Sequence, residues 1–284
     1  TWIDGITYTA SNNTATHTLT NAAGCDSVVT LNLILRADSV SVSASPELIC
    51  SGSSTTLTAS GGTAYSWSTG ETTTSITVSP SDTTTYSVQI QQHATCTATI
   101  PITVNTINLP IVNAGNDQAI CIGSSANFSA SGASTYLWTP TATLSDSAIF
   151  NPVASPTVNT TYIVEGTDAN GCINTDTIDV TINSLPTVEA GTNFSLCVGE
   201  SGQLAGSGAT SYSWSPNTGL SNPNIYNPTV TVSANQTFTL TGTDANGCSN
   251  TDQITITAKS VPGLNVTALP AIICNGSSSI AYAS

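Results

Sequence analysis

The sequence predicts an all-β protein, built as a tandem array of small β-sandwiches that are each stapled by a disulfide bond. Three observations predict this fold class. A Cys–Trp–Cys pattern recurs three times at almost constant spacing, which is the signature of a repeat protein. Runs in which Thr, Val, Ile and Tyr alternate with polar residues, as at 75–78, 178–182 and 254–257, are typical of half-buried strands. Clusters of Gly, Asn, Asp and Pro separate these runs, and no segment has helical periodicity.

Each repeat opens with a cysteine in a Cys-x-Gly turn, has a tryptophan at the same offset from it (67 − 50 = 138 − 121 = 214 − 197), and closes with a second cysteine. The hexapeptide that ends in the closing cysteine is identical at 167–172 and 243–248. Its Asp-Ala-Asn-Gly sequence predicts a hairpin turn between the last two strands, because these residues tolerate positive φ. The opening cysteines are Cys50, Cys121 and Cys197, the tryptophans are Trp67, Trp138 and Trp214, and the closing cysteines are Cys96, Cys172 and Cys248.

Connectors that contain proline follow the last predicted strand of each repeat, at 108–110, 185–186 and 261–262. Residues 16–35 match only the last hairpin of a repeat, and Cys274 opens a further one. We therefore expect five segments. They are the C-terminal part of a preceding module at 1–36, complete modules at 37–107, 108–184 and 185–260, and the start of a further module at 261–284.

Eight cysteines in regular positions, with no Cys-x-x-Cys pair and only two histidines, indicate disulfides in an oxidising compartment and hence an exported protein. Two cysteines, Cys25 and Cys274, lack a partner within a complete module. Two alternatives stay open for them: they join adjacent copies in a polymer, or Cys25 bonds Cys50. For the rest we predict local pairs, namely Cys50 with Cys96, Cys121 with Cys172, and Cys197 with Cys248.

The tryptophans are expected to fill the cores of the modules. A tyrosine lies two residues before each of them, at 65, 136 and 212, and therefore faces the same side of its strand. We predict that Trp67, Trp138 and Trp214 pack between the two sheets. The alternative is that they form an exposed platform for sugar rings.

Composition excludes several classes of function. The chain has 2 Lys and Arg together against 16 Asp and Glu, and a formal net charge of −14. Nucleic acids and anionic membrane surfaces both require many basic residues, so neither is expected as a partner. No apolar run is long enough to span a bilayer, and no signal peptide begins at Thr1. We expect the information for export to lie elsewhere.

Catalysis is not expected either. The two histidines, His17 and His93, fall in different segments, and no hydrolase, metalloprotease or phosphate-binding motif is present. No catalytic and no metal-binding residues are therefore predicted. A minor alternative is calcium, because oxygen ligands gather near two of the turns, although turn formation and solubility explain them better. These residues are Asp168, Asn170, Asp176 and Asp179, with Asp244, Asn246 and Asp252 in the next repeat.

As a set, the motifs resemble the immunoglobulin-like and PKD-like repeats of large cell-surface proteins of Bacteroidota, including gliding-type adhesins and other type IX secretion substrates. The resemblance rests on Cys-x-Gly-Ser-Ser at 50, 121 and 274, on Cys-Val-Gly-Glu-Ser at 197, on Tyr-x-Trp, on Asn-Thr-Thr-Tyr at 159–162, and on Thr-Asp-Ala-Asn-Gly-Cys. It implies an immunoglobulin-like sandwich in every module. Module 37–107 departs from the pattern, since Gln-Gln-His-Ala-Thr precedes Cys96.

The same resemblance directs attention to O-glycosylation, which in Bacteroidota follows the pattern Asp, then Ser or Thr, then Ala, Ile, Leu, Val, Met or Thr. Bulky glycans would protect strand edges and hinder proteases in a chain so poor in charge. The matching acceptors are Ser27, Ser39, Thr83, Ser147 and Thr177.

The repeats and the resemblance together predict a structural stalk or fibre segment of an exported, O-glycosylated bacterial surface protein, which projects adhesive or other terminal domains. Its expected location is extracellular, at the cell surface. Its expected partners are neighbouring modules or subunits of the same fibre and covalent glycans, without cofactors. The alternatives are a subunit of a self-assembling extracellular filament, joined by strand addition or docking, and a ligand-binding adhesin module.

Overall fold

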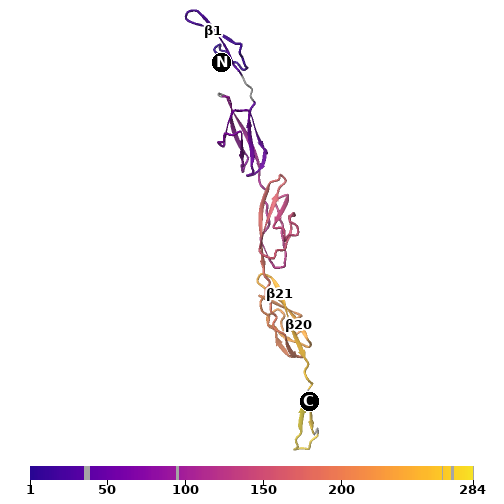
Figure 1. Ribbon diagram of the computed structural model, residues 1–284. Coiled ribbons are helices and arrows are strands. Elements are labelled where there is room, and N and C mark those ends of the chain that lie inside the picture. Colours follow the sequence, from indigo (N-terminus) through magenta and orange to yellow (C-terminus); the bar gives the residue numbers. More distant parts are fainter. Residues whose placement is uncertain (35–38, 94–95, 264, 270–271, 284) are drawn as a thin grey trace. The chain divides into compact units, whose positions relative to one another are not determined.

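The computed structural model describes residues 1–34, 39–93, 96–263, 265–269 and 272–283. The all-β prediction is confirmed, because these residues form 23 strands and no helix (Figure 1). The expected boundary between 36 and 37 and the Asp before Ser39 lie outside the described residues. The chain divides into two compact units, 1–110 with 168–173, and 111–167 with 174–284.

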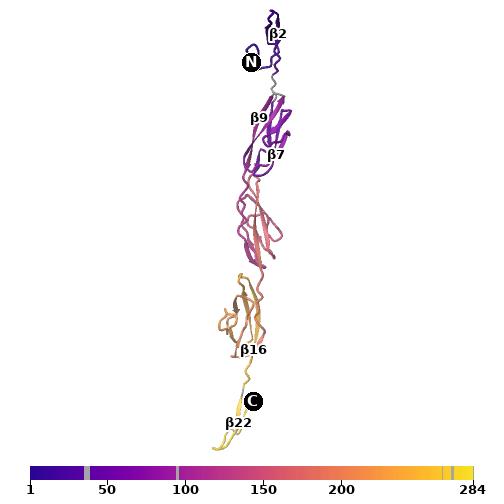
Figure 2. The same ribbon diagram turned by 90° about the vertical axis from the view of Figure 1, so that its left-hand side faces the viewer.

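Residues 39–107, which we call module 1, fold into two sheets. A three-stranded sheet has the order β3-β5-β7, and a four-stranded sheet has the order β4-β9-β8-β6. Strands β7 and β9 thus belong to different sheets (Figure 2). The strands are β3 (Ser41–Ser45), β4 (Leu48–Cys50), β5 (Thr55–Ser60), β6 (Ala64–Trp67), β7 (Ser75–Val78), β8 (Thr84–His93) and β9 (Cys96–Ile107).

Residues 108–184 and 185–260, which we call modules 2 and 3, repeat a second version of this arrangement. Each has a four-stranded sheet, in the orders β10-β15-β14-β12 and β16-β21-β20-β18, and a two-stranded sheet, β11-β13 or β17-β19. Module 2 contains β10 (Gln118–Cys121), β11 (Ala126–Asn127), β12 (Thr135–Thr139), β13 (Val153–Ala154), β14 (Thr160–Thr167) and β15 (Ile173–Asn183). Module 3 contains β16 (Phe194–Cys197), β17 (Ser201–Gln203), β18 (Ser211–Ser215), β19 (Thr229–Thr231), β20 (Gln236–Thr243) and β21 (Ser249–Lys259).

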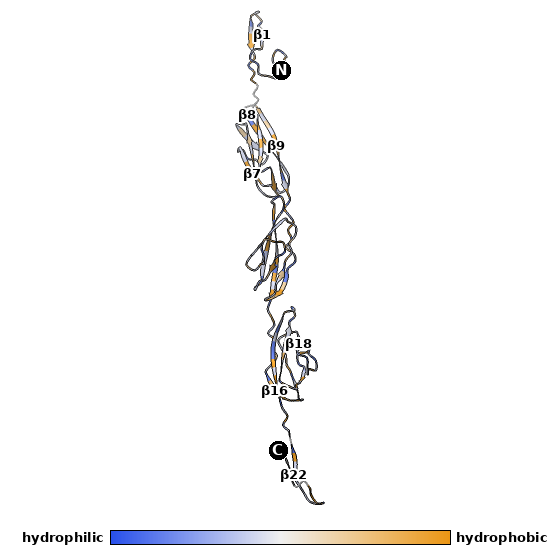
Figure 3. Cartoon of the chain, turned by 90° about the vertical axis from the view of Figure 1, so that its right-hand side faces the viewer, coloured by the Kyte–Doolittle hydropathy of each residue, from blue (hydrophilic) through white to orange (hydrophobic). Residues whose placement is uncertain are grey.

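Each module has its own buried core, formed by the inward-facing residues of strands in which apolar and polar positions alternate (Figure 3). Trp67, Trp138 and Trp214 are the largest side chains in these cores and are 3%, 0% and 2% exposed. Each indole N–H donates a hydrogen bond to a backbone carbonyl, that of Thr73, Ile149 or Ile225. The rings are therefore packed between the sheets and present no platform to a ligand.

In each four-stranded sheet, the strand that comes first in the chain pairs in parallel with the strand that comes last in the chain. In module 2, β10 lies along the end of β15, with Cys121 opposite Asn183. The corresponding registers place Cys50 opposite Ile107 in module 1 and Cys197 opposite Lys259 in module 3. The opening cysteine of a module therefore lies at the end of the last strand, whereas the closing cysteine lies at its start.

Two hairpins flank the modules. Strands β1 (Thr16–Thr20) and β2 (Asp26–Thr30) form one, and β22 (Val266–Leu269) and β23 (Ile280–Ala283) form the other. The second hairpin has the register of β3 with β5 in module 1: Val42 lies opposite Ala59 there, and Val266 lies opposite Ala283 here, at one constant offset (266 − 42 = 283 − 59). Within the described residues, no helix is long and apolar enough to cross a membrane.

Candidate functional site: disulfides between modules

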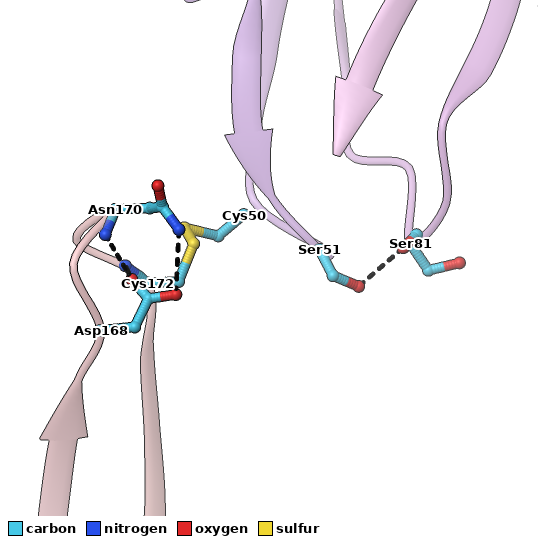
Figure 4. Close-up of a disulfide and its surroundings, with 6 residues drawn as sticks. All are labelled: Cys50, Ser51, Ser81, Asp168, Asn170 and Cys172. Carbon is cyan, nitrogen blue, oxygen red and sulfur yellow. Dashed lines mark hydrogen bonds between the residues drawn. A yellow bond between two sulfur atoms is a disulfide. The ribbon is translucent and has the colours of Figure 1, made fainter. Parts of the chain in front are cut away.

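Two disulfides link consecutive modules. Cys50 of module 1 bonds Cys172 of module 2, and Cys121 of module 2 bonds Cys248 of module 3. The Cα atoms are 5.5 Å apart in both bonds. Figure 4 shows that the first bond joins the end of β4 to the turn that precedes β15. Each bond therefore connects the opening cysteine of one module to the closing cysteine of the next.

The three predicted local pairs, Cys50 with Cys96, Cys121 with Cys172, and Cys197 with Cys248, are wrong, because each contains a cysteine that bonds a cysteine of another module. In module 2, Cys121 lies opposite Asn183, the last residue of β15, and Cys172 lies directly before the first residue of that strand, 11 positions earlier in the chain (183 − 172). At a rise of about 3.3 Å per residue, the two cysteines are about 36 Å apart. A disulfide requires Cα atoms within about 7 Å. The same interval of 11 separates Cys96 from Ile107 and Cys248 from Lys259, so no complete module can pair its own cysteines.

The closing cysteine is held by a turn whose geometry comes from its own sequence. In the turn at 168–172, the backbone N–H of Asp168 donates to the carbonyl of Cys172 at 3.0 Å, and that of Gly171 donates to the carbonyl of Asp168 at 3.2 Å. Asp168 Oδ1 accepts hydrogen bonds from the backbone N–H groups of Asn170 and Cys172 (Figure 4). Gly171 has φ of +83°, a conformation that glycine adopts without strain. The turn at 244–248 has the same hydrogen bonds.

These N–H groups also set the acidity of the turn carboxylate. The backbone N–H of Cys172, followed by that of Asn170, lowers the pKa of Asp168 below its ordinary value. Hydrogen bonds that favour a charged carboxylate stabilise the folded turn whenever that carboxylate is ionised.

The backbone around the opening cysteine is also held by hydrogen bonds. Its carbonyl accepts a hydrogen bond from the backbone N–H three residues later, from Ser53 to Cys50 and from Ser124 to Cys121, both at 2.9 Å. The residue after the cysteine is tied to the last strand, because Ser51 N–H donates to the carbonyl of Ile107. The Ser51 hydroxyl donates to the carbonyl of Ser81 at 2.7 Å (Figure 4). Both halves of each disulfide are thus built on ordered backbone.

The two cysteines of each bond differ in exposure. Cys172 and Cys248 are completely buried, whereas Cys50 and Cys121 are half-buried. A reductant in solution can reach a bond of this kind only by way of the opening cysteine. The asymmetry favours bonds that persist once they have formed, because thiol–disulfide exchange depends on access to sulfur.

Among the described residues, four cysteines are free: Cys25, Cys96, Cys197 and Cys274. Cys197 has the backbone environment of a bonded opening cysteine, since Val198 N–H donates to the carbonyl of Lys259 and Glu200 N–H donates to the carbonyl of Cys197. Cys96 is exposed and lies opposite His93, where the Asp-Ala-Asn-Gly turn is absent. The alternative bond between Cys25 and Cys50 is wrong, because Cys50 bonds Cys172.

The two disulfide loops overlap along the chain. One encloses residues 50–172 and the other residues 121–248, with sequence separations of 122 and 127. Any single break in the backbone between Cys50 and Cys248 therefore lies inside at least one loop. The two products of such a break stay covalently joined.

The oxygen ligands considered for calcium have other roles within the modules. Asp176 Oδ2 accepts from the N–H of Ala114, and Asp252 Oδ2 accepts from the N–H of Ala190, both at 2.8 Å. The Ala190 N–H lowers the pKa of Asp252. Asp179 Oδ1 accepts from the hydroxyl of Thr161. In the part of the chain that the structure describes, no three His, Cys, Asp or Glu residues are grouped so that they could hold a metal ion.

The remaining residues singled out in the sequence lie on the surface or near it. The glycosylation acceptors Ser27, Ser39, Thr83 and Thr177 are exposed, and Ser147 is half-exposed. His17 lies edge-on to Trp2, with ring centroids 6.4 Å apart, and His93 is exposed at the end of β8.

No protein-family model matches the chain, and no curated protein matches it. Similar solved structures include the N-terminal eight Ig domains of Down Syndrome Cell Adhesion Molecule, with 12% identity, a TM-score of 0.31, and coverage of 94% of this chain and 47% of that one. The I9–I11 tandem of titin has 11% identity, a TM-score of 0.30, and coverage of 75% and 96%. A calcium-stabilised adhesin of an Antarctic bacterium has 13% identity, a TM-score of 0.33, and coverage of 87% and 81%.

These neighbours are tandem Ig-like proteins and a bacterial adhesin. The chain spans about half the length of the first of them. Likeness at this level carries no argument about function, which must come from the modules themselves and the bonds between them.

Proposed function

We propose that the chain is a structural stalk or fibre segment of an exported bacterial cell-surface protein, which projects adhesive or other terminal domains and carries mechanical force. The single observation that carries this proposal is the pair of overlapping disulfides between consecutive modules. A disulfide within a module limits the extension of that module alone when the chain is pulled. A bond between modules gives a pulling force a second covalent route past each junction.

The overlap limits how far the chain extends if the modules unfold under load. Along the backbone alone, the stretch from Cys50 to Cys248 (248 − 50 = 198) reaches about 700 Å when fully extended. With both bonds intact, the shortest covalent route crosses the first bond, returns along the backbone from Cys172 to Cys121 (172 − 121 = 51), and crosses the second. That route reaches only about 180 Å.

An extracellular location agrees with these bonds, because disulfides form and persist in oxidising surroundings. The module boundaries are part of the proposal and rest on the repeat spacing and the connectors that contain proline. The origin in Bacteroidota and type IX secretion are also part of it and rest on the sequence resemblance. So does glycosylation at Ser27, Ser39, Thr83, Ser147 and Thr177, which are all accessible to some degree. Peptide mass spectrometry of native material should find sugar on these residues, and five bare side chains would remove the glycan from the proposal.

Single-molecule pulling on the full chain, tethered at its two ends, tests the mechanical role. Reduction should release about 500 Å of contour length. The backbone route is longer than the route through the two disulfides by 147 residues (198 − 51), and these residues can be stretched only after reduction. An oxidised chain that already extends as far as the reduced one would contradict the proposal.

The double variant Cys96→Ser, Cys197→Ser is the matched control. Neither residue takes part in a disulfide bond in the structure, so in the variant the two disulfides should still limit the extension of the whole stretch from Cys50 to Cys248. If the cysteines paired within modules, this variant could form only the bond between Cys121 and Cys172, and only the stretch between these two residues would be kept from extending under force. The control therefore separates bonds between modules from bonds within them.

A further inference from the structure

An exposed aromatic side chain lies at the same place in modules 2 and 3. Phe150 is 52% exposed and Tyr226 is 55% exposed, and their positions differ by the same interval as the two copies of the turn hexapeptide (226 − 150 = 248 − 172). The chain has only 4 Phe and 8 Tyr, and Phe128, Phe238 and Tyr162 are buried in cores. The exposure of Phe150 and Tyr226 is therefore not a consequence of an abundance of aromatic residues.

The backbone that carries each of these rings is fixed. The carbonyl of Phe150 accepts a hydrogen bond from Ala130 N–H at 2.7 Å, and the carbonyl of Tyr226 accepts one from Gly206 N–H at 2.6 Å. The preceding carbonyls, those of Ile149 and Ile225, accept the indole N–H of Trp138 and Trp214, both at 3.0 Å. A ring on backbone held in this way is ready for contact before any ligand arrives, which lowers the cost of binding.

Module 1 supplies an internal comparison. Ala59 N–H donates to the carbonyl of Thr74 at 2.9 Å, and the preceding carbonyl, that of Thr73, accepts the indole N–H of Trp67. Thr74 therefore occupies the position of Phe150 and Tyr226. The fold accepts a small polar residue there, so the aromatic rings of modules 2 and 3 are not required for folding.

In module 2 the ring borders a shallow groove of about 590 Å³, within the size range of ligand sites. Its walls contain a second aromatic residue, Tyr136, whose hydroxyl is bonded to the backbone of Ala133. In module 3 the corresponding rings, Tyr212 and Tyr226, have centroids 6.3 Å apart. The groove is lined by Ala130, Ser131, Gly132, Ser134, Thr135, Tyr136, Ala148, Ile149, Phe150 and Asn151, among which there is no Asp, Glu, Lys, Arg or His.

We propose that the groove at Phe150 and the corresponding aromatic pair of module 3, Tyr212 and Tyr226, bind neutral carbohydrate. The C–H face of a pyranose is apolar and can stack on an aromatic ring, while its rim of hydroxyl groups meets the hydroxyls and the amide of the wall. The walls of the groove in module 2 lack charged groups, and the chain has a net charge of −14, so an anionic glycan is disfavoured. A glycan attached to Ser147 of the chain itself does not serve as the common ligand, because the equivalent position in module 3 is Pro223, which has no hydroxyl group to carry a sugar. The ligand therefore comes from another molecule.

The test is isothermal titration of the full, unglycosylated chain with cellohexaose, xylohexaose, laminarihexaose and mannohexaose. We expect at least one of them to bind at two sites. The double variant Phe150→Thr, Tyr226→Thr places the residue of module 1 at both positions and should fold normally, because Thr74 has the same backbone hydrogen bonds. It should weaken binding about ten-fold or more, the effect of losing one stacked ring.

The reverse change, Thr74→Tyr, should add a third site or strengthen the average affinity. Failure of all four hexasaccharides to bind would overturn the proposal, as would unchanged binding by the double variant. Sedimentation velocity completes the test. If the wild-type chain self-associates and the double variant does not, the aromatic residues Phe150 and Tyr226 are contacts between copies of the chain, and the carbohydrate assignment is wrong.

Discussion

The turns at 168–172 and 21–25 have the same hydrogen bonds but cysteines in opposite states. In both, a side-chain oxygen of the first residue accepts from the backbone N–H groups two and four residues later, Asp168 in one and Asn21 in the other. Cys172 is buried and bonded, whereas Cys25 is exposed and free. The turn therefore forms without its disulfide. The bond depends on a second element, the opening cysteine of another module.

The largest effect is expected from removal of the bond at the first of these turns. Cys172→Ser frees Cys50 and opens a loop with a sequence separation of 122, which corresponds to a loss of about 5 kcal/mol from the chain entropy of the unfolded state. Differential scanning calorimetry should show a lower melting temperature. Cys25→Ser is the matched control at an equivalent turn, and it should leave the thermogram unchanged. Equal effects of the two changes would contradict a special role for the bond.

A smaller effect is expected from the side chain that forms the turn. Asp168→Asn replaces the carboxylate with the amide found at Asn21, so the turn should form as before. The pKa of Asp168 is lowered in the folded state, so its contribution to stability is present above the ordinary pKa of about 3.9. That contribution is lost as the pH falls through this value toward the folded pKa.

The measurement is the difference in melting temperature between the wild type and Asp168→Asn, followed from neutral pH to pH 2. The difference should be small at neutral pH, in favour of the wild type, and should disappear in acid. The reciprocal change, Asn21→Asp, should give the turn at 21–25 the same acid sensitivity. A difference that does not vary with pH would show that the charge on Asp168 has no part in stabilising the turn.

The two turns also show what can be predicted from sequence. The Asp-Ala-Asn-Gly sequence predicts the turn because its determinants, an Asx side chain and Gly171 with positive φ, are local. Trp138 lies in a core because its strand alternates, and that pattern is visible over a few residues. The repeat spacing is likewise visible in the sequence, and it predicts the three separate cores that the structure has.

The pairing of the cysteines was not predictable in this way. Cys121 and Cys172 belong to the same repeat, which favours pairing them, but the parallel pairing of β10 with β15 puts Cys121 beside Asn183, at the far end of the strand. That register is a property of the sheet and has no local signal. Phe150 and Tyr226 were missed for a related reason, because an exposed aromatic residue in a loop looks the same in sequence as a buried one.

The most direct test of the central claim, that disulfides join consecutive modules, is to cut the chain between two of them. A protease recognition sequence is placed in the connector at 185–186, in a chain with Cys197→Ser and Cys274→Ser to prevent stray bonds. After cleavage and thiol blocking, the products are separated in denaturant without reductant. We predict one covalently joined species, held by the bond between Cys121 and Cys248, which divides only when reductant is added. Two separate fragments without reductant would contradict the account.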